Sequence, residues 1–300
     1  MSIARLEREP CAAVGSYDAY VVSATLTDGR QLRLFLKDYG ASRRPRRDAR
    51  ARRERELGVY RELLPGAGLG TARHLGEAWD DDRHWLLLEL VEGASLRDLE
   101  PERWIAPLEW LGRLHGRFAG AWESSAPPPF LERHDERYFR AKADGALTAV
   151  ASLTPWLAER MATVRKRLHA VLPVLAAGPH TLVHGAFLPA NVIVAPGKPP
   201  RTCVVDWELA AVGGPIYDLA FFCDGFEPPA LDRMLAAYRR GAEASGLGLP
   251  PDAELRRAID CFRLHRVANW LEAAEHKRYG DEAIERLVGR GELLSVLVEA

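Results

Sequence analysis

The spacing of apolar residues in the first ninety positions predicts mostly strands. Residues 31–37 alternate polar and apolar, which is the period of a half-buried strand, and residues 20–26 are rich in strand-forming types. Between them, Thr27-Asp28-Gly29-Arg30 is a hairpin turn signal. We also expect a strand ahead of Ser16, a helix over 46–64 stopped by Pro65-Gly66, and a second hairpin from strands at 74–79 and 84–91.

After Glu92-Gly93 the spacing becomes helical. A helix over 101–122 would place Leu108, Leu111, Leu114, His115 and Phe118 on one face. Further helices are expected at 135–150, at 155–176 and repeatedly from 216 to 298, with short apolar strands at 191–194 and 202–205. The pattern predicts an α+β protein with a small β-rich lobe at 1–92 and a large, mostly helical lobe at 93–300. A cleft between two lobes is a common place for a ligand.

Composition excludes several classes of protein. Apolar residues make up 47% of the chain, which is enough for a real core, and the net charge of −1 gives no general attraction to nucleic acid or to a membrane. The start of the chain lacks an apolar signal core, and no run approaches the roughly 18 apolar residues of a membrane span. Four widely spaced cysteines favour reduced, mostly buried thiols in the cytoplasm, and scattered histidines without a ligand motif do not support zinc.

The strongest chemical signal is the loop His184-Gly185-Ala186-Phe187-Leu188-Pro189-Ala190-Asn191, which Asp206 follows at the end of an apolar run. A His-x-Asp-x-x-x-x-Asn loop followed by a strand that ends in Asp is how kinases place a base and a metal pair. Here the position of the base is Ala186. His184 and Asn191 complete the candidate catalytic loop, and Asn191 and Asp206 are candidate magnesium ligands because they carry oxygen donors.

The β-rich lobe holds candidates for binding a nucleotide. Lys37 on the strand over 31–37 is a candidate for the α- and β-phosphates, although a strand lysine that only reaches solvent is the commoner case. Glu56 on the following helix is its candidate partner, in competition with Glu54 and Glu62.

Three weaker signals complete the predicted site. The backbone amides of Gly15 and Ser16 would contact phosphate, or they belong to a plain turn. The Glu89 carbonyl and the Val91 amide would contact adenine. Asp218 is expected to have a structural role, either at the start of a helix or in bracing the candidate catalytic loop.

With its segments LVHGAFLPANVIV, VVDWE and GGPIYDLA, the chain resembles the aminoglycoside phosphotransferase and choline kinase family, relatives of protein kinases. The match covers most of the first 225 residues. The resemblance implies a bilobal protein-kinase-like fold, ATP or GTP as donor, Mg²⁺, and a hydroxyl on a small molecule as acceptor. The family's residue at position 186 would be the Asp that orients the acceptor hydroxyl and takes its proton, so this copy is expected to be nearly inactive.

The expected function is therefore an ATP-dependent O-phosphotransferase acting on a natural product, antibiotic or metabolite. The intact Lys37, Asn191 and Asp206 favour a single deliberate Asp-to-Ala change, because a natural pseudokinase scaffold would be expected to lose those residues by drift. A third option is a kinase of Ser or Thr in a biosynthetic peptide. The Arg-rich segment Arg43–Arg55 would then grip an acidic peptide, although a solvated helix face is the plainer interpretation.

Residues that would border the acceptor pocket lie after the hinge. The candidates are the run 134–138, Asp224, Glu227 and Trp270. Acidic residues there would suit a cationic acceptor, but acids and bases nearly balance over 222–300, so the sequence does not select one.

Overall fold

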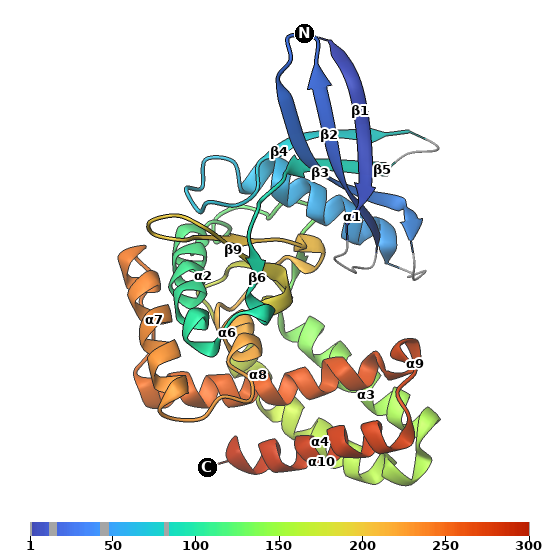
Figure 1. Cartoon of the computed structure of the whole chain (residues 1–300). Coiled ribbons are helices and arrows are strands. Elements are labelled where there is room, and N and C mark those ends of the chain that lie inside the picture. The colour runs from blue at the N-terminus through green and yellow to red at the C-terminus, as the bar shows by residue number, and fades with distance from the viewer. Residues whose placement is uncertain (1, 12–16, 43–47, 81–83, 300) are drawn as a thin grey trace. The chain divides into compact units, whose positions relative to one another are not determined.

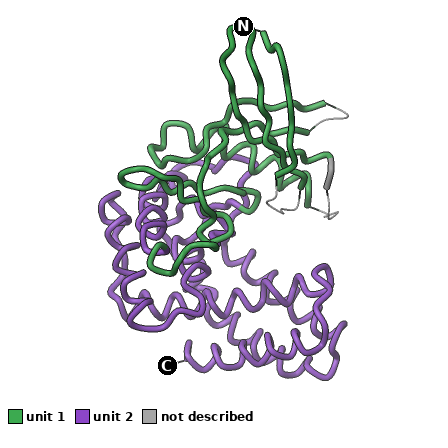
Figure 2. Tube along the Cα trace, in the orientation of Figure 1, with its two compact units in different colours: residues 1–103, 189–209 green, residues 104–188, 210–300 purple. Residues whose placement is uncertain are grey.

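The computed structural model describes residues 2–11, 17–42, 48–80 and 84–299. The chain separates into two compact units (Figure 2). The first unit comprises residues 1–103 and 189–209, and the second comprises 104–188 and 210–300. The segment with both candidate metal ligands therefore belongs to the first unit. The assignment of nucleotide binding to 1–92 and of acceptor binding to 93–300 stays a prediction.

The first unit is built on a five-stranded antiparallel sheet (Figure 1) with the order β1-β2-β3-β5-β4. The predicted hairpin is confirmed, since the Leu26 amide donates to the Arg30 carbonyl at 2.8 Å across the turn. The strand expected ahead of Ser16 is also present. The bounds are β1 Ile3–Pro10, β2 Tyr17–Leu26, β3 Gln31–Ser42, β4 His74–Trp79 and β5 His84–Glu89.

The helix of the first unit, α1, runs over Ala49–Gly58 and continues as the π-helical turn Val59–Leu63. It ends before Pro65-Gly66 as the sequence predicts, because proline cannot extend the hydrogen-bond ladder and Gly66 adopts a φ of +73°. The expected start at 46 lies outside the described residues. Glu56, Leu57 and Tyr60 lie on the buried side of this element.

A small three-stranded sheet, of order β10-β9-β6, completes the first unit. Its strands are β6 Ala94–Ser95, β9 Val192–Ala195 and β10 Arg201–Val204. Gly93 precedes β6 where a Cβ would lie 2.6 Å from the Val194 carbonyl oxygen, so only glycine fits there. In the β9–β10 hairpin Val192 faces Val204, and the Val205 amide donates to the Asn191 carbonyl at 2.9 Å. Residues 191 and 206 therefore emerge at the same end of the hairpin.

The second unit is mainly helical, as expected. Helix formation over 155–176 breaks at Val171, and Pro173 lies in the short helix that follows. The short strands β6, β7, β8 and β11 escaped prediction because two or three residues cannot display a period of two. The bounds are α2 Ile105–Phe118, β7 Glu132–Arg133, α3 Glu136–Leu153, α4 Ala158–Ala170, α5 Leu172–Leu175, β8 Thr181–Val183, β11 Ala211–Gly213, α6 Ile216–Phe222, α7 Ala230–Ala244, α8 Asp252–Glu272, α9 Ala274–Lys277 and α10 Asp281–Leu297.

Helix α2 packs closely on α7. A Cβ at Gly241 would lie 1.9 Å from the Glu109 carbonyl oxygen, and one at Gly112 would lie 2.3 Å from that of Tyr238. The backbones can approach this far only because both positions are glycine. The face of α2 that the sequence predicts to be apolar is buried throughout. Within the described residues no helix combines the length and apolarity needed to cross a bilayer.

His265 on α8 is fully buried, and neither ring nitrogen has a hydrogen-bond partner among the described residues. Its ring meets that of Phe139 on α3 edge-on, with 4.7 Å between centroids. Burial lowers the pKa of His265 to about 3, and the nearby Lys142 ammonium adds to this effect. The folded protein therefore keeps this imidazole neutral at pH values where the unfolded chain protonates it.

We expect His265 to make the protein less stable in acid. Above its unfolded pKa of about 6.5 the residue contributes no pH dependence, and below it the unfolding free energy falls by up to about 1.4 kcal/mol per pH unit down to the folded pKa. The measurement is urea unfolding at pH 7.5 and pH 5. His265→Phe should reduce the difference between the two pH values, whereas His276→Gln, at an exposed site on α9, should not. Equal pH dependence in all three proteins would contradict this assignment.

Candidate active site

The predicted lysine and its glutamate form a buried ion pair in the first unit. Lys37 Nζ lies 2.6 Å from Glu56 Oε2 and 2.7 Å from Asp206 Oδ1. The side chains of Lys37 and Glu56 are 11% and 2% exposed, whereas that of Asp206 is 38% exposed. The competing glutamates pair elsewhere on the surface, Glu54 with Arg50 and Glu62 with Arg61. The structure thus selects Glu56 as the partner, and binding of phosphate by Lys37 stays a prediction.

Electrostatics keeps this lysine charged. Burial alone would lower the pKa of Lys37, but the carboxylates of Asp206 and Glu56 outweigh it, and the pKa lies well above its ordinary value. Burial raises the pKa of Glu56, and the Lys37 ammonium opposes that shift. A permanently protonated ammonium held by two carboxylates has a fixed direction, which suits it to bind a polyanion.

Tyr39 holds Glu56 in place, and sequence reasoning missed it. The Tyr39 hydroxyl donates to Glu56 Oε2 at 2.7 Å. Burial raises the pKa of Tyr39 well above its ordinary value, and the Glu56 carboxylate adds to this, so the hydroxyl stays a donor. Lys37 and Tyr39 are two residues apart on β3 and therefore share a face of the strand. That spacing is the signal that would have found Tyr39.

The two candidate metal ligands, Asn191 and Asp206, lie at the same end of the β9–β10 hairpin. Asp206 adopts a φ of +68°, which is uncommon for a residue with a side chain, and its ion pair with Lys37 anchors the carboxylate. Among the described residues no three His, Cys, Asp or Glu side chains gather as metal ligands. An amide and one carboxylate nevertheless fit Mg²⁺, which usually takes one or two carboxylates and completes its shell with phosphate and water.

The first part of the candidate catalytic loop, residues 184–188, lies in the second unit and is braced by Asp218 at the start of α6. Asp218 Oδ2 accepts from the His184 amide at 2.6 Å, and Oδ1 accepts from the Gly185 amide at 2.9 Å. His115 Nε2 lies 3.3 Å from the same carboxylate, and its Nδ1 lies 2.9 Å from the Tyr238 hydroxyl. All of these side chains are buried. The predicted support of the loop by Asp218 is confirmed.

The loop around Ala186 is intact apart from the missing carboxylate. The Ala186 amide donates to His184 Nδ1 at 3.2 Å, while the His184 side chain is fully buried. Phe187 is buried as well, with 5.0 Å between its ring centroid and that of Phe222. His184 therefore shapes the loop, and its assignment to catalysis stays a prediction. The backbone is held on both sides of position 186, by the contacts of Gly185 and of Phe187. The direction of an acidic side chain at position 186 would therefore be fixed.

Two arginines of the Arg-rich segment Arg43–Arg55 form hydrogen bonds within the first unit. Arg52 Nη1 donates to Glu208 Oε1 at 3.0 Å, and Arg55 Nη1 donates to the Glu208 carbonyl at 2.9 Å. Glu208 comes two residues after Asp206, so these bonds tie α1, which carries Glu56, to the segment that carries the candidate metal ligand. Arg43, Arg44, Arg46 and Arg47 lie outside the described residues.

The remaining nucleotide contacts stay predictions. The Glu89 side chain binds Arg201 Nη1 at 2.8 Å, which lowers the pKa of that carboxyl, and the Glu89 amide donates to the Arg73 carbonyl at 2.9 Å. The adenine contacts assigned to the Glu89 carbonyl and the Val91 amide involve backbone only. Gly15 and Ser16 lie outside the described residues.

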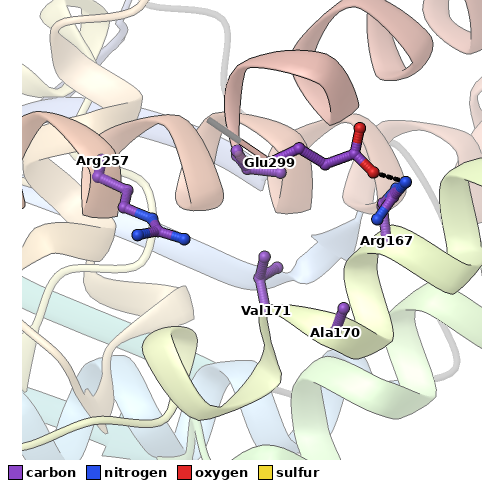
Figure 3. A pocket seen from close by; sticks show the side chains of 6 residues that line it. Arg167, Ala170, Val171, Arg257 and Glu299 are labelled. Carbon is purple, nitrogen blue, oxygen red and sulfur yellow. Dashed lines mark ion pairs between the residues drawn. The ribbon is translucent and has the colours of Figure 1, made fainter.

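Two hollows in the second unit contain none of the predicted residues. One of about 430 Å³ is lined by Arg167, Ala170, Val171, Arg257, Val298 and Glu299 (Figure 3). Its rim carries the ion pair between Arg167 and Glu299. The other, of about 620 Å³, lies between the segments 173–179 and 248–262. We assign no function to either hollow.

A sheet-based unit with a buried Lys–Glu pair, and a braced loop ahead of an Asn and an Asp, are the parts of a kinase-like phosphotransferase. The chain belongs to the phosphotransferase enzyme family known as APH, whose family model matches residues 12–280. The family resemblance drawn from the sequence is thus confirmed. Use of a nucleotide and a divalent metal is general in kinase-like enzymes of this class.

Solved structures support the same fold. Macrolide 2'-phosphotransferase MphH from Brachybacterium faecium is 20% identical, with 95% of this chain and 91% of that chain covered at a TM-score of 0.61. A choline kinase from Cryptosporidium parvum is 11% identical, with 98% and 90% covered at a TM-score of 0.64. The predicted kinase-like α+β fold is confirmed.

A curated relative matches part of the chain. Mouse acyl-CoA dehydrogenase family member 10 is 28% identical over 136 residues. The match covers 45% of this chain and only 11% of that protein. The activity of the mouse protein is therefore not carried over to this chain.

Proposed function

We propose that this protein is an ATP-dependent O-phosphotransferase, here in an inactivated form, that acts on a hydroxyl of a small molecule such as a natural product, antibiotic or metabolite. The observation that carries the proposal is the position of Lys37 Nζ within 2.7 Å of both Glu56 and Asp206. A solvent-exposed lysine would need no such pair of carboxylates. Four free cysteines, three of them buried, accord with a cytoplasmic location.

Each residue has a stated role in this proposal. Lys37, directed by Glu56 and Tyr39, binds the donor phosphates, with GTP as an alternative to ATP. Asn191 and Asp206 would hold Mg²⁺, which neutralises charge on the transferring phosphate when bound. The backbone of the 184–186 loop, held by Asp218, fixes where the base stands relative to the rest of the second unit. A carboxylate at 186 would orient the acceptor hydroxyl and take its proton.

Ala186 is the observation that favours a second function. Because the base position lacks an acceptor atom, the protein as it stands would bind nucleotide and transfer phosphate very slowly, as expected of a pseudokinase scaffold. An engineered Asp-to-Ala change gives the same chemistry. The intact Lys37 and Asp206 pairing favours the engineered variant, because a scaffold under no selection for transfer would not need to keep it.

We expect the protein to bind ATP saturably in the presence of Mg²⁺, and Lys37→Met to weaken the affinity about tenfold or more through loss of a charge-assisted contact. Calorimetric titration with ATP and with GTP measures both affinities and decides the donor. Lys142→Met is the matched control, since Lys142 pairs with Glu272 in the second unit. If neither nucleotide binds, or if Lys37→Met binds as well as the parent, the proposal fails.

A further inference from the structure

Three arginines surround one nearly buried carboxylate in the second unit. Asp224 lies just after α6, and its side chain is 9% exposed. Arg266 Nη1 lies 3.4 Å from Asp224 Oδ2, and Arg263 Nε lies 3.9 Å from Oδ1. Arg290 donates to the same Oδ1. Helix α8 supplies two of these arginines and α10 supplies the third, so tertiary packing brings them together.

Positive charge is in excess in this arginine cluster of Arg263, Arg266 and Arg290. In the part of the chain that the structure describes, the other carboxylate that pairs with it is Asp260, 3.1 Å from Arg263 Nη1. Three guanidiniums therefore face two carboxylates. Burial lowers the pKa of Arg266, Asp224 opposes this, and Arg290 adds to the lowering. The like charges repel one another, and an anionic ligand would relieve that repulsion.

Donors remain for such a ligand. Arg266 Nη1 donates to the Phe221 carbonyl and Arg290 Nη2 to Asp224, and within the described chain these two guanidiniums make no further hydrogen bond. A guanidinium carries five N–H donors in a plane that matches carboxylate and phosphate oxygens. Both lie over the ring of Trp270, at 4.6 and 5.6 Å from its centroid. Arg290 is 38% exposed and hence open to solvent.

The cluster lies close to the catalytic loop. Helix α6 begins beside the loop, through the bonds from Asp218 to residues 184 and 185, and ends two residues before Asp224. A helix of seven residues is about 10 Å long. Phe187 of the loop packs on Phe222, and Arg266 lies 4.9 Å from the ring centroid of the neighbouring Phe221. A small molecule with its hydroxyl at position 186 could span this distance.

We propose that the acceptor carries a negatively charged group, a carboxylate or a phosphate ester, and that Arg266 and Arg290 bind it. This inference rests on the proposed phosphotransferase function and names the class of its acceptor. Asp224 was a candidate to receive a cationic acceptor, but its carboxylate is already bound by arginines. An acceptor amine would meet a surplus of like charge here, which disfavours aminosugars.

The test uses four sugars that share a pyranose ring and differ in charge: glucuronate, glucose 6-phosphate, glucose and glucosamine. Calorimetric titration of the protein as it stands should show saturable binding of one or both anions, with glucose and glucosamine at least about tenfold weaker. Comparison of the first two sugars separates a carboxylate from a phosphate. Arg290→Gln should weaken anion binding about tenfold, and Arg290→Lys, which keeps the charge beside Asp224, should weaken it less.

The matched control is Arg286→Gln, one turn earlier on α10, where the side chain is 73% exposed and pairs with Glu282. Thermal unfolding of each variant checks the fold. The proposal is overturned if glucosamine or glucose binds as tightly as the anions, if no anion saturates below about 20 mM, or if Arg290→Gln and Arg290→Lys both bind anions like the parent.

Failure of this inference is distinguishable from failure of the proposed function. If the Ala186→Asp protein phosphorylates glucose or glucosamine while the anions do not bind, the phosphotransferase function stands and the anion site does not. If the anions bind through Arg290 but no acceptor is phosphorylated, the anion site stands and the phosphotransferase function falls.

Discussion

Replacement of Ala186 by aspartate should raise the rate of phosphoryl transfer to a hydroxyl acceptor by about 10²–10⁴-fold, the usual contribution of a general base. The structure supplies the reason. The loop backbone is already held by Asp218 through the amides of His184 and Gly185, so a new carboxylate at 186 would be oriented without rearrangement of the loop. The measurement is transfer of label from [γ-³²P]ATP to a panel of hydroxyl compounds.

A matched control tests whether the effect of Ala186→Asp depends on the position of the new carboxylate or only on its charge. Ala190→Asp adds the same carboxylate to the same stretch of sequence at an exposed site and should leave transfer at the level of the parent. Nucleotide affinity should be similar in all three proteins, because Lys37, Asn191 and Asp206 are unchanged. If Ala186→Asp binds ATP and yet phosphorylates nothing in a broad panel, the protein is a nucleotide-binding scaffold.

Replacement of Asp206 by asparagine in the Ala186→Asp protein should lower transfer at least about 10²-fold, since it removes the charged candidate ligand of Mg²⁺. The same change should abolish the dependence of ATP affinity on Mg²⁺. Lys37 keeps its 2.6 Å contact with Glu56, so the fold of the first unit should survive. Titrations of ATP with and without Mg²⁺ measure the effect.

Asp28→Asn serves as the control, because Asp28 is an exposed carboxylate that pairs with Arg30 at the β2–β3 turn. It should leave both transfer and the Mg²⁺ dependence unchanged. If Asp206→Asn keeps the full Mg²⁺ dependence of ATP affinity, Asp206 is not the metal ligand. Its ion pair with Lys37 would then remain as a structural role.

The sequence was sufficient for the fold class and for the loop that Asp218 braces, whose catalytic role stays a prediction. Strand and helix periods are local properties, so the β2–β3 hairpin, α1 and the apolar face of α2 could be predicted without tertiary information. The loop at 184–191 and Asp206 can be recognised together because a hairpin separates them in the sequence. The residues directly before and after a hairpin lie at the same end of it. The two- and three-residue strands were missed because they have too few residues for a period.

Only the tertiary structure decided which distant residues act together. The sequence names Glu56 in competition with Glu54 and Glu62, and the structure decides for Glu56 because it is buried against Lys37 and Tyr39. The role of Glu208 in fixing α1 and the gathering of Arg263, Arg266 and Arg290 around Asp224 likewise depend on how separate elements pack. Spacing along a chain determines contacts within an element or hairpin, whereas burial and charge pairing between elements are properties of the folded state.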